Sequence, residues 1–185
     1  MPVLISMLRG INVGGHNKIK MDALRSLYAS LKFEEPQTYV QSGNVIFRTK
    51  ERDLALVQKR IQLGIERQFG CCPEVMLRTV ADLRAVVAEN PFARRRDVEP
   101  SKLLVLFLAG EAASDARENL RKIETGLEEL RLSSRELYIY FPNGVGKSKL
   151  PWTRIDKVLN TPATGRNWNS VERVLEIAER MESAP

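Results

Sequence analysis

The sequence predicts an α+β protein of two related lobes. In residues 1–79, apolar runs and helical patterns alternate in the order strand, helix, strand, strand, helix, strand. This βαββαβ order is typical of a ferredoxin-like sandwich, in which helices cover one face of an antiparallel sheet. The second half begins the same order again. Between the halves, the segment 90–101 holds two prolines and a charge cluster, so we expect the boundary between the lobes there.

The first lobe is expected at residues 1–89. The apolar run "PVLISML" at 2–8 predicts a buried strand, and a helix follows whose apolar face is Leu24, Leu27, Tyr28 and Leu31. The stretch "TYVQSGNVIFRT" predicts a hairpin, because Gly43 at its centre allows the positive φ of a tight turn. A second helix is expected to end near Gly70, before the strand "PEVMLRT", and a short third helix completes the lobe.

The second lobe is expected at 102–185. The run "KLLVLFLA" predicts a strand, and a helical pattern and two further strand-like runs around Ser133-Ser134 follow it. Two helices are expected to close the lobe, which gives the order βαββαα. Asn169 and Glu172 have the spacing of a capping box, so we expect the last helix to begin beside them.

Composition and charge narrow the classes of partner. Lys and Arg total 29 against 23 for Asp and Glu, and the formal charge of +6 favours anionic partners. No run approaches the roughly 20 apolar residues of a membrane span, and we expect no signal peptide, no membrane partner and a cytoplasmic location. The two cysteines, Cys71 and Cys72, are adjacent, so we expect ordinary reduced thiols rather than a disulfide framework, with a redox role as the alternative.

Three stretches fit no ordinary helix or strand pattern, and all three are basic. They are "RGINVGGHNKIK" at 9–20, "PNGVGKSKL" at 142–150 and "TGRNW" at 164–168, and none contains an acidic residue. The first two are each expected to join a strand to a helix. Glycines there let backbone N–H groups turn toward a guest, and a helix N-terminus adds partial positive charge. Neither fits a Walker loop or GxGxxG, so phosphate or carboxylate binding is indicated by the types of residue present and not by a known motif.

We expect at least two of the three stretches to form one anion-binding cleft between the lobes. The plainer alternative is that each is a solvated basic turn. The candidate ligand-binding residues are Arg9, Asn12, Gly14, Gly15, His16, Asn17, Lys18, Gln41, Ser42, Asn44, Lys147, Ser148, Lys149, Arg166, Asn167 and Trp168.

At these stretches the sequence resembles a known bacterial family. The segments "LRGINVGGHNKIKM", "YVQSGNVIF", "NPF", "YFPNGVGKSKL" and "RNWNSV" occur in the order found in domain of unknown function 1697, from Met7 to about Ala178. The resemblance implies a two-lobed α+β fold and assigns no catalytic residue. Except for His16 and Lys18, the candidate residues fall on the family's motif positions, which also include Gly10 and Gly43.

The inventory of reactive residues excludes several enzyme classes. With one histidine, two adjacent cysteines and no HExxH or CxxC, neither a His-rich metal site nor a structural zinc is expected. A Ser-His-Asp triad would have to use His16, and no GxSxG elbow is present. Transfer or hydrolysis of a phosphorylated substrate remains open as an activity. Asp22 and Asp156 are the carboxylates expected nearest such a site, and a magnesium ion could arrive bound to the phosphate. The sequence identifies no cofactor. Both aspartates also have a structural explanation, because an acidic residue in the first turn of a helix interacts favourably with the helix dipole.

Two other functions are kept as alternatives. A βαββαβ order with basic surface resembles an RNA-binding module, and "Ala-Arg-Arg-Arg" at 93–96 would suit a phosphate backbone. The expected first strand, however, carries no aromatic residue for stacking on a base. The other alternative is a protein-interaction or structural unit without a ligand. Trp168, in a polar setting, is either a pocket wall or a packing residue.

Overall fold

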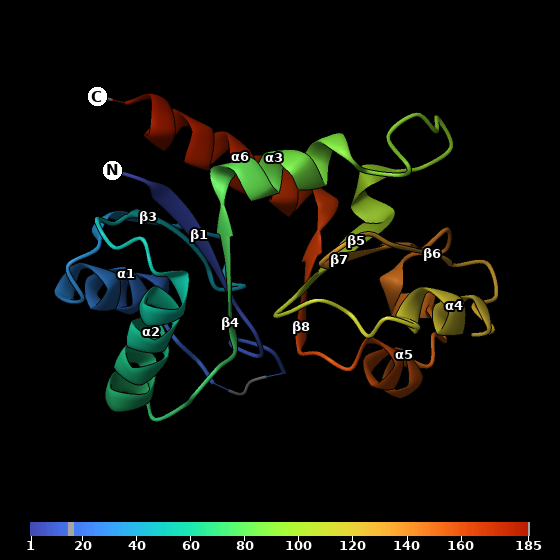
Figure 1. Cartoon of the computed structure of the whole chain (residues 1–185), viewed down its shortest axis with the longest axis horizontal. Helices are drawn as coiled ribbons and strands as arrows, with labels where there is room; N and C mark the ends of the chain where they lie inside the picture. Colours follow the sequence, from blue (N-terminus) through green and yellow to red (C-terminus); the bar gives the residue numbers. More distant parts are fainter. Residues whose placement is uncertain (15–16, 185) are drawn as a thin grey trace. The chain divides into compact units, whose positions relative to one another are not determined.

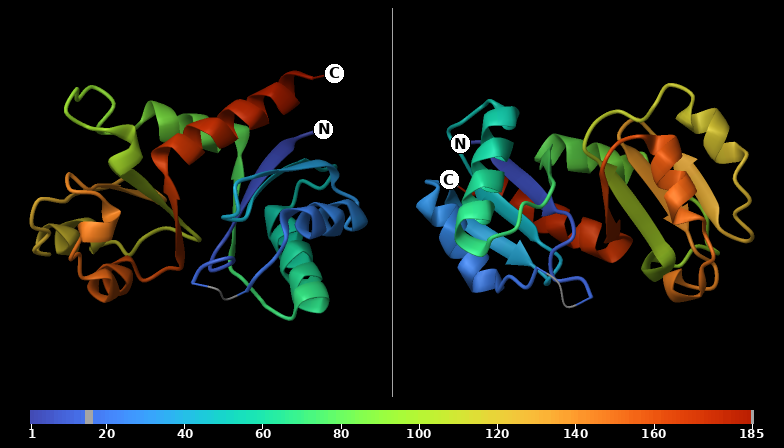
Figure 2. Two further views of the ribbon diagram at one scale, coloured as in Figure 1. Left: turned by 180° about the vertical axis from the view of Figure 1, so that it is seen from behind. Right: turned by 90° about the horizontal axis from the view of Figure 1, so that it is seen from below.

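The computed structural model of the chain describes residues 1–14 and 17–184. The chain divides into two compact units, which we call unit 1 (Met1–Ala85 and Arg173–Pro185) and unit 2 (Val86–Glu172). In the described residues, each unit holds one four-stranded antiparallel sheet with helices, as Figures 1 and 2 show. This confirms the predicted α+β class and the presence of two sheet-containing parts.

Unit 1 follows the order predicted from the sequence. Its strands lie in the order β2-β3-β1-β4, and each neighbouring pair is antiparallel. Its elements in chain order are β1 (Val3–Leu8), α1 (Met21–Ser30), β2 (Glu34–Tyr39), β3 (Asn44–Arg48), α2 (Leu54–Phe69) and β4 (Val75–Thr79).

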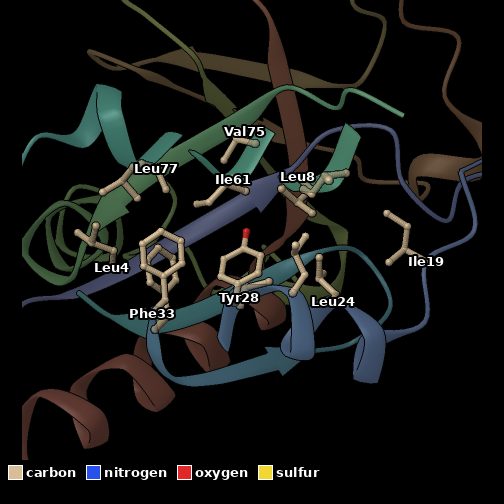
Figure 3. Close-up of a cluster of buried hydrophobic side chains, with 14 of the residues drawn as sticks. Leu4, Leu8, Ile19, Leu24, Tyr28, Phe33, Ile61, Val75 and Leu77 are labelled. Atoms are coloured by element: carbon tan, nitrogen blue, oxygen red, sulfur yellow. The ribbon is translucent and has the colours of Figure 1, made fainter. Parts of the chain in front are cut away.

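The core of unit 1 lies between one face of this sheet and the helices α1 and α2. Leu4 and Leu8 of β1 point into it with Leu24 and Tyr28 of α1, as Figure 3 shows. The Tyr28 ring packs edge-on against Phe47 at 5.2 Å, and its hydroxyl lies 2.8 Å from that of Ser6. Full burial of each large apolar side chain contributes about 1.5–3 kcal/mol to the stability of the fold. This cluster therefore stabilises the sheet from which the β1–α1 loop extends.

Helix α2 begins and ends at residues that satisfy its terminal backbone groups. The Asp53 carboxylate accepts hydrogen bonds from the N–H groups of Ala55 (2.9 Å) and Leu56 (3.2 Å). At the other end Gly70 has φ +71° and donates its N–H to the Glu66 carbonyl oxygen. The predicted stop at Gly70 is therefore confirmed, and its reason is the left-handed conformation that glycine adopts without strain.

Unit 2 contains a strand that the sequence analysis missed. Its sheet order is β6-β7-β5-β8, again with antiparallel neighbours. Its elements are η1 (Pro100–Lys102), β5 (Leu103–Leu108), α4 (Ala116–Arg121), β6 (Glu129–Leu132), β7 (Glu136–Tyr140), η2 (Val145–Lys147), α5 (Trp152–Leu159) and β8 (Ala163–Asn167). The expected order βαββαα is corrected to βαββαβ followed by a helix. The stretch 164–168, expected to be a loop, lies in the edge strand β8 except for Trp168, which begins that last helix.

The division into units differs from the lobe boundaries expected at 1–89, 90–101 and 102–185. It falls inside α3 (Val80–Ala88) and α6 (Trp168–Ser183), so the last part of α6 belongs to unit 1. There, Arg84 forms ion pairs of 2.7 Å with both Glu179 and Glu182. Helix α6 also begins one residue before the expected cap, because the Asn167 side chain accepts the N–H of Asn169.

The segment 90–101 is packed rather than a free linker. Phe92 is buried and its ring centroid lies 6.0 Å from that of Tyr140, whose hydroxyl donates to the Asp97 carbonyl oxygen. Arg95 forms ion pairs of 2.6 Å with Asp97 and Glu129, and these contacts raise the pKa of its guanidinium. Arg95 is therefore neutralised within unit 2, which weakens the case for 93–96 as a phosphate-backbone contact.

Candidate functional site

The β1–α1 loop, residues 9–20, is organised by Asn12. Its side-chain amide donates to the carbonyl oxygens of Ile19 (3.0 Å) and Gln41 (2.9 Å), and its Oδ1 accepts the Ile19 N–H at 2.8 Å. Asn17 adds a further side-chain hydrogen bond, in which its Nδ2 donates to the Gly10 carbonyl oxygen at 3.0 Å. Within the described residues, these bonds hold Gly10, Asn12, Asn17 and Ile19 together and join this part of the loop to the β2–β3 turn.

The β2–β3 turn fits against this loop through Gly43. A Cβ added there would lie 2.6 Å from Cδ1 of Ile11 and 2.9 Å from Cβ of Leu8, and the φ of +77° is itself left-handed. The Gly43 carbonyl oxygen accepts the Leu8 N–H at 3.0 Å. Beside it, Asn44 is buried and donates its Nδ2 to the Ser42 hydroxyl. Unit 1 therefore brings together the candidate residues Arg9, Asn12, Gly14, Asn17, Lys18, Gln41, Ser42 and Asn44.

The cations of this loop are open to solvent. Arg9, Lys18 and Lys20 are exposed, and no carboxylate among the described residues forms an ion pair with them. The Arg9 backbone N–H donates a hydrogen bond to the main-chain carbonyl oxygen of Glu74. Gly15 and His16 lie outside the described residues, so their predicted roles stay predictions.

The β7–α5 loop, residues 142–150, is a second basic stretch without acidic residues, and it lies in unit 2. Gly144 turns the chain with φ +83°, and the short helix η2 follows it. The Ser148 hydroxyl accepts the Leu150 N–H at 3.1 Å, which fixes the end of the loop. Lys147 and Lys149 are exposed and, within the described chain, carry no ion pair.

Asn167 lies at the same end of the unit 2 sheet as the start of this loop. Its Nδ2 donates to the Ser101 carbonyl oxygen at 2.8 Å, and the Phe141 N–H donates to that of Lys102 at 2.9 Å. The ends of β7 and β8 therefore flank the segment that leads into β5. The structure brings these two candidate stretches of unit 2 to one end of one sheet, while the predicted contribution of all three stretches to one cleft stays a prediction.

Arg166 and Trp168 are both buried, and the burial of Trp168 agrees with the packing alternative. Arg166 exposes 6% of its surface and donates from Nη1 to the Thr164 hydroxyl and the Gly165 carbonyl oxygen, both at 2.8 Å. Burial lowers the pKa of its guanidinium to about 10. Trp168 exposes 5%. Side chains alternate between the two faces along β8, and this alternation explains the burial of Arg166. The sequence analysis did not predict this burial because it did not predict the strand.

A second buried arginine occupies the matching position of unit 1. Arg78 in β4 pairs with Ile5 of β1, and Arg166 in β8 pairs with Val105 of β5. Each arginine is thus the fourth residue of its strand, opposite the third residue of the first strand of the sheet. The sequence analysis did not find Arg78, because a charged residue in an apolar run reads as an outward-facing position.

The described residues offer no dedicated metal site. No group of three His, Cys, Asp or Glu side chains within them could hold a metal ion. Of the aspartates considered for catalysis, Asp22 forms an ion pair with Arg25 at the start of α1, which supports the structural explanation. Cys71 and Cys72 are free thiols, and burial raises the pKa of Cys71.

The comparisons with known proteins agree with the resemblance found in the motifs. The model of a family described as "Protein of unknown function (DUF1697)" matches residues 1–138. The chain belongs to the DUF1697 family. The matched range includes the β1–α1 loop and the β2–β3 turn but ends before Lys147 and Arg166. A search of curated proteins gives no match.

A solved structure similar to this DUF1697 chain supports the fold. It is titled the structure of conserved bacterial protein SP0830 from Streptococcus pneumoniae, with 21% sequence identity and a TM-score of 0.74. The similarity covers 96% of this chain and 98% of that one. At this identity the likeness concerns the fold alone. In the described part of the chain, no helix combines the length and apolar character needed to cross a membrane.

Proposed function

We propose that this DUF1697 protein binds a small phosphorylated or otherwise anionic ligand through the β1–α1 loop of unit 1, and that the β7–α5 loop of unit 2 has the chemistry of a separate anion contact. The observation that carries the proposal is the backbone of the β1–α1 loop. Gly10, Asn12 and Gly14 have positive φ values of 72°, 54° and 57°, and the residues between them do not. An alternating sign of φ is a feature of anion-binding nests, in which backbone N–H groups turn to the same side; here the Asn12 N–H donates to the Asn17 carbonyl oxygen at 3.2 Å, which leaves the N–H groups of Ile11, Val13 and Gly14 as the proposed donors.

The charges of the loop support the same ligand class. Arg9, Lys18 and Lys20 add three cations around this backbone, and the stretch contains no acid. Elsewhere in unit 1, Arg84 is neutralised by two glutamates of α6. In the described part of the loop, the Asn12 hydrogen bonds already hold Ile19 and Gln41 in place, so less ordering is required there when an anion binds.

We also propose that each unit is a ferredoxin-like sandwich and that the two arose from one repeated unit. Both have the order βαββαβ, and in both the second, third, first and fourth strands follow one another across the sheet. The matching registers of Arg78 and Arg166 support this. The repeat is one of architecture, since the loops that carry glycine and lysine lie in different connections of the two units.

A thermal-shift screen tests the ligand proposal. The purified chain is heated with inorganic phosphate, pyrophosphate, nucleotides, sugar phosphates, acidic metabolites or a short single-stranded RNA. A ligand at a hundred times its dissociation constant adds about 2.7 kcal/mol, which raises Tm by roughly 5–10 °C for a chain of this size. We expect such a shift with a small anion.

Matched variants locate the binding. Arg9→Ala and Lys147→Ala are compared with Lys59→Ala and Lys157→Ala, which remove exposed cations of α2 and α5. Arg9→Ala should lose the shift and the helix variants should keep it, while Lys147→Ala tests the unit 2 loop separately. Loss in only one loop variant would assign the ligand to one unit. A shift with RNA alone, falling steeply with salt, would replace the proposal with nucleic-acid binding, and no shift with any compound would leave the interaction-unit alternative.

A further inference from the structure

Unit 2 has a second concave feature, separate from the basic loops. A cavity of about 520 Å³ lies between helix α4, the edge strand β6 and the connection between them. Its apolar part includes Leu120, Ile123, Leu130 and Leu132. Its charged part holds three arginines, Arg117, Arg121 and Arg131, and two glutamates, Glu128 and Glu129, of which Glu129 forms ion pairs with Arg95 and Arg131. The volume lies within the range of ordinary ligand pockets, and one side of the cavity is a strand with no neighbour on that side.

The register shows which backbone groups β6 presents at this edge. The Ser133 N–H donates to the Glu136 carbonyl oxygen, so this opposed pair is hydrogen-bonded. Because such pairs alternate along an antiparallel ladder, Arg131 and Glu129 also turn their N–H and C=O groups toward β7. Leu130 and Leu132 therefore direct theirs outward. The Leu130 carbonyl oxygen indeed accepts a hydrogen bond from the Arg131 guanidinium on that side, at 3.0 Å.

Strand β2, one of the two edge strands of the unit 1 sheet, is protected in a way that β6 is not. Strand β2 contains Pro36, and its pairing with β3 shifts register between Glu34 and Gln37. Proline and irregular pairing are common devices against strand addition. Strand β6 contains no proline, and its register with β7 is regular from Glu129 to Leu132.

The charges beside the edge indicate what would cover it. Arg117 and Arg121 are four residues apart in α4, so they project on the same face and repel each other. Both are exposed, and within the described residues neither has a carboxylate partner, whereas Lys122 of the same region pairs with Glu118. An anionic side chain placed between them would relieve this repulsion.

We propose that β6 and the α4 arginines bind an extended acidic segment of a partner protein, which adds to the sheet as a fifth strand. This goes beyond the proposed anion site and uses none of its residues. Residues of the segment opposite Leu130 and Leu132 exchange backbone hydrogen bonds with them and place their side chains on the α4 side. Acidic residues two apart would then meet Arg117 and Arg121. A second copy of the chain is disfavoured, because its own α4 arginines would approach these.

The test uses the whole chain and a capped peptide of alternating valine and glutamate, nine residues long. Binding is followed by fluorescence anisotropy and by the amide signals of Leu130 and Leu132 in 15N NMR spectra. Two matched peptides carry N-methyl groups on the glutamates or on the valines. The register predicts that glutamate N-methylation weakens binding about tenfold or more, because it removes donors to Leu130 and Leu132, while valine N-methylation leaves it nearly unchanged.

The protein variants separate charge from backbone pairing. Arg117→Ala with Arg121→Ala should weaken binding about tenfold at low salt and less at high salt. The control, Arg94→Ala with Arg96→Ala, removes two exposed arginines of the same unit and should leave binding unchanged. Absence of saturable binding up to about 1 mM peptide, equal effects of the two N-methylated peptides, or concentration-dependent dimerisation through β6 would each overturn the proposal.

Discussion

The side-chain amide of Asn12 donates a 2.9 Å hydrogen bond to the carbonyl oxygen of Gln41. The two residues are 29 positions apart, and this bond joins the β1–α1 loop to the β2–β3 turn. Because the same side chain also bonds both backbone groups of Ile19, one asparagine determines the shape of the loop on which the proposed anion site rests.

Replacing Asn12 with alanine should therefore lower both stability and ligand binding. Three hydrogen bonds are lost at a half-buried site, and we expect a loss of about 1–3 kcal/mol in the free energy of unfolding. Urea denaturation measures this loss, and faster hydrogen exchange of the Ile19 amide would locate it. Asn143→Ala, at an exposed position in unit 2, is the control and should change the free energy by less than about 0.5 kcal/mol.

Two glycines separate backbone strain from steric contact. Gly43 and Gly10 have similar φ values of +77° and +72°, but a Cβ at Gly43 would lie 2.6 Å from Ile11 whereas none of the described atoms lies within 4 Å of one at Gly10. Gly10→Ala should cost about 1–2 kcal/mol from strain alone. Gly43→Ala should cost at least about 1 kcal/mol more, and adding Ile11→Ala should recover part of the difference. Equal losses in the two single variants would argue against the packing of turn and loop.

The contribution of α6 to unit 1 is tested by two arginines of different burial. Arg48 exposes 7% of its surface and donates to the carbonyl oxygens of Met181 and Ala184, at the end of α6. Arg48→Ala should destabilise the chain by about 1.5–3 kcal/mol and increase hydrogen exchange in the last turn. Changing the exposed Arg84 to alanine should destabilise the chain much less, and its effect should shrink with added salt.

Tyr28 gives a defined dependence of stability on pH. Burial raises the pKa of its hydroxyl well above the ordinary value of 10.0, and the hydrogen bond with Ser6 only partly opposes this. Above pH 10 the unfolded chain releases this proton more readily than the folded one, so the stabilising contribution of Tyr28 is complete below pH 10 and falls as the pH rises. Urea midpoints between pH 8 and 11 measure the decline, which should be smaller in Tyr28→Phe. An equal decline in that variant would contradict the assignment.

The sequence predicts the elements of unit 1 because each carries its own local signal. Apolar spacing marks α1 and α2, and Gly70 and Gly43 mark the end of a helix and a turn. Strand β8 has no such signal. Its residues "ATGRN" neither alternate in polarity nor favour a strand, and they become one by pairing with β5, where Gly165 fits against Leu106.

The candidate site was predictable in composition but not in geometry. The glycines, asparagines and lysines of 9–20 and 142–150 mark basic connections, and the structure places both between a strand and a helix. No pattern in the sequence indicates that Asn12 bonds to Gln41, since that contact depends on the turn formed far along the chain. Arg166 shows the opposite error, because a basic residue beside glycine suggested a loop, whereas burial follows from the strand it occupies.

The most direct test of the account is a 15N NMR titration of the chain with pyrophosphate. We predict saturable shifts of the backbone amides of Ile11, Asn12, Val13 and Gly14, with an affinity that falls in Arg9→Ala and is unchanged in Lys59→Ala. Saturable shifts confined to other parts of the chain, or none up to about 10 mM pyrophosphate, would contradict the proposal that this loop binds anions.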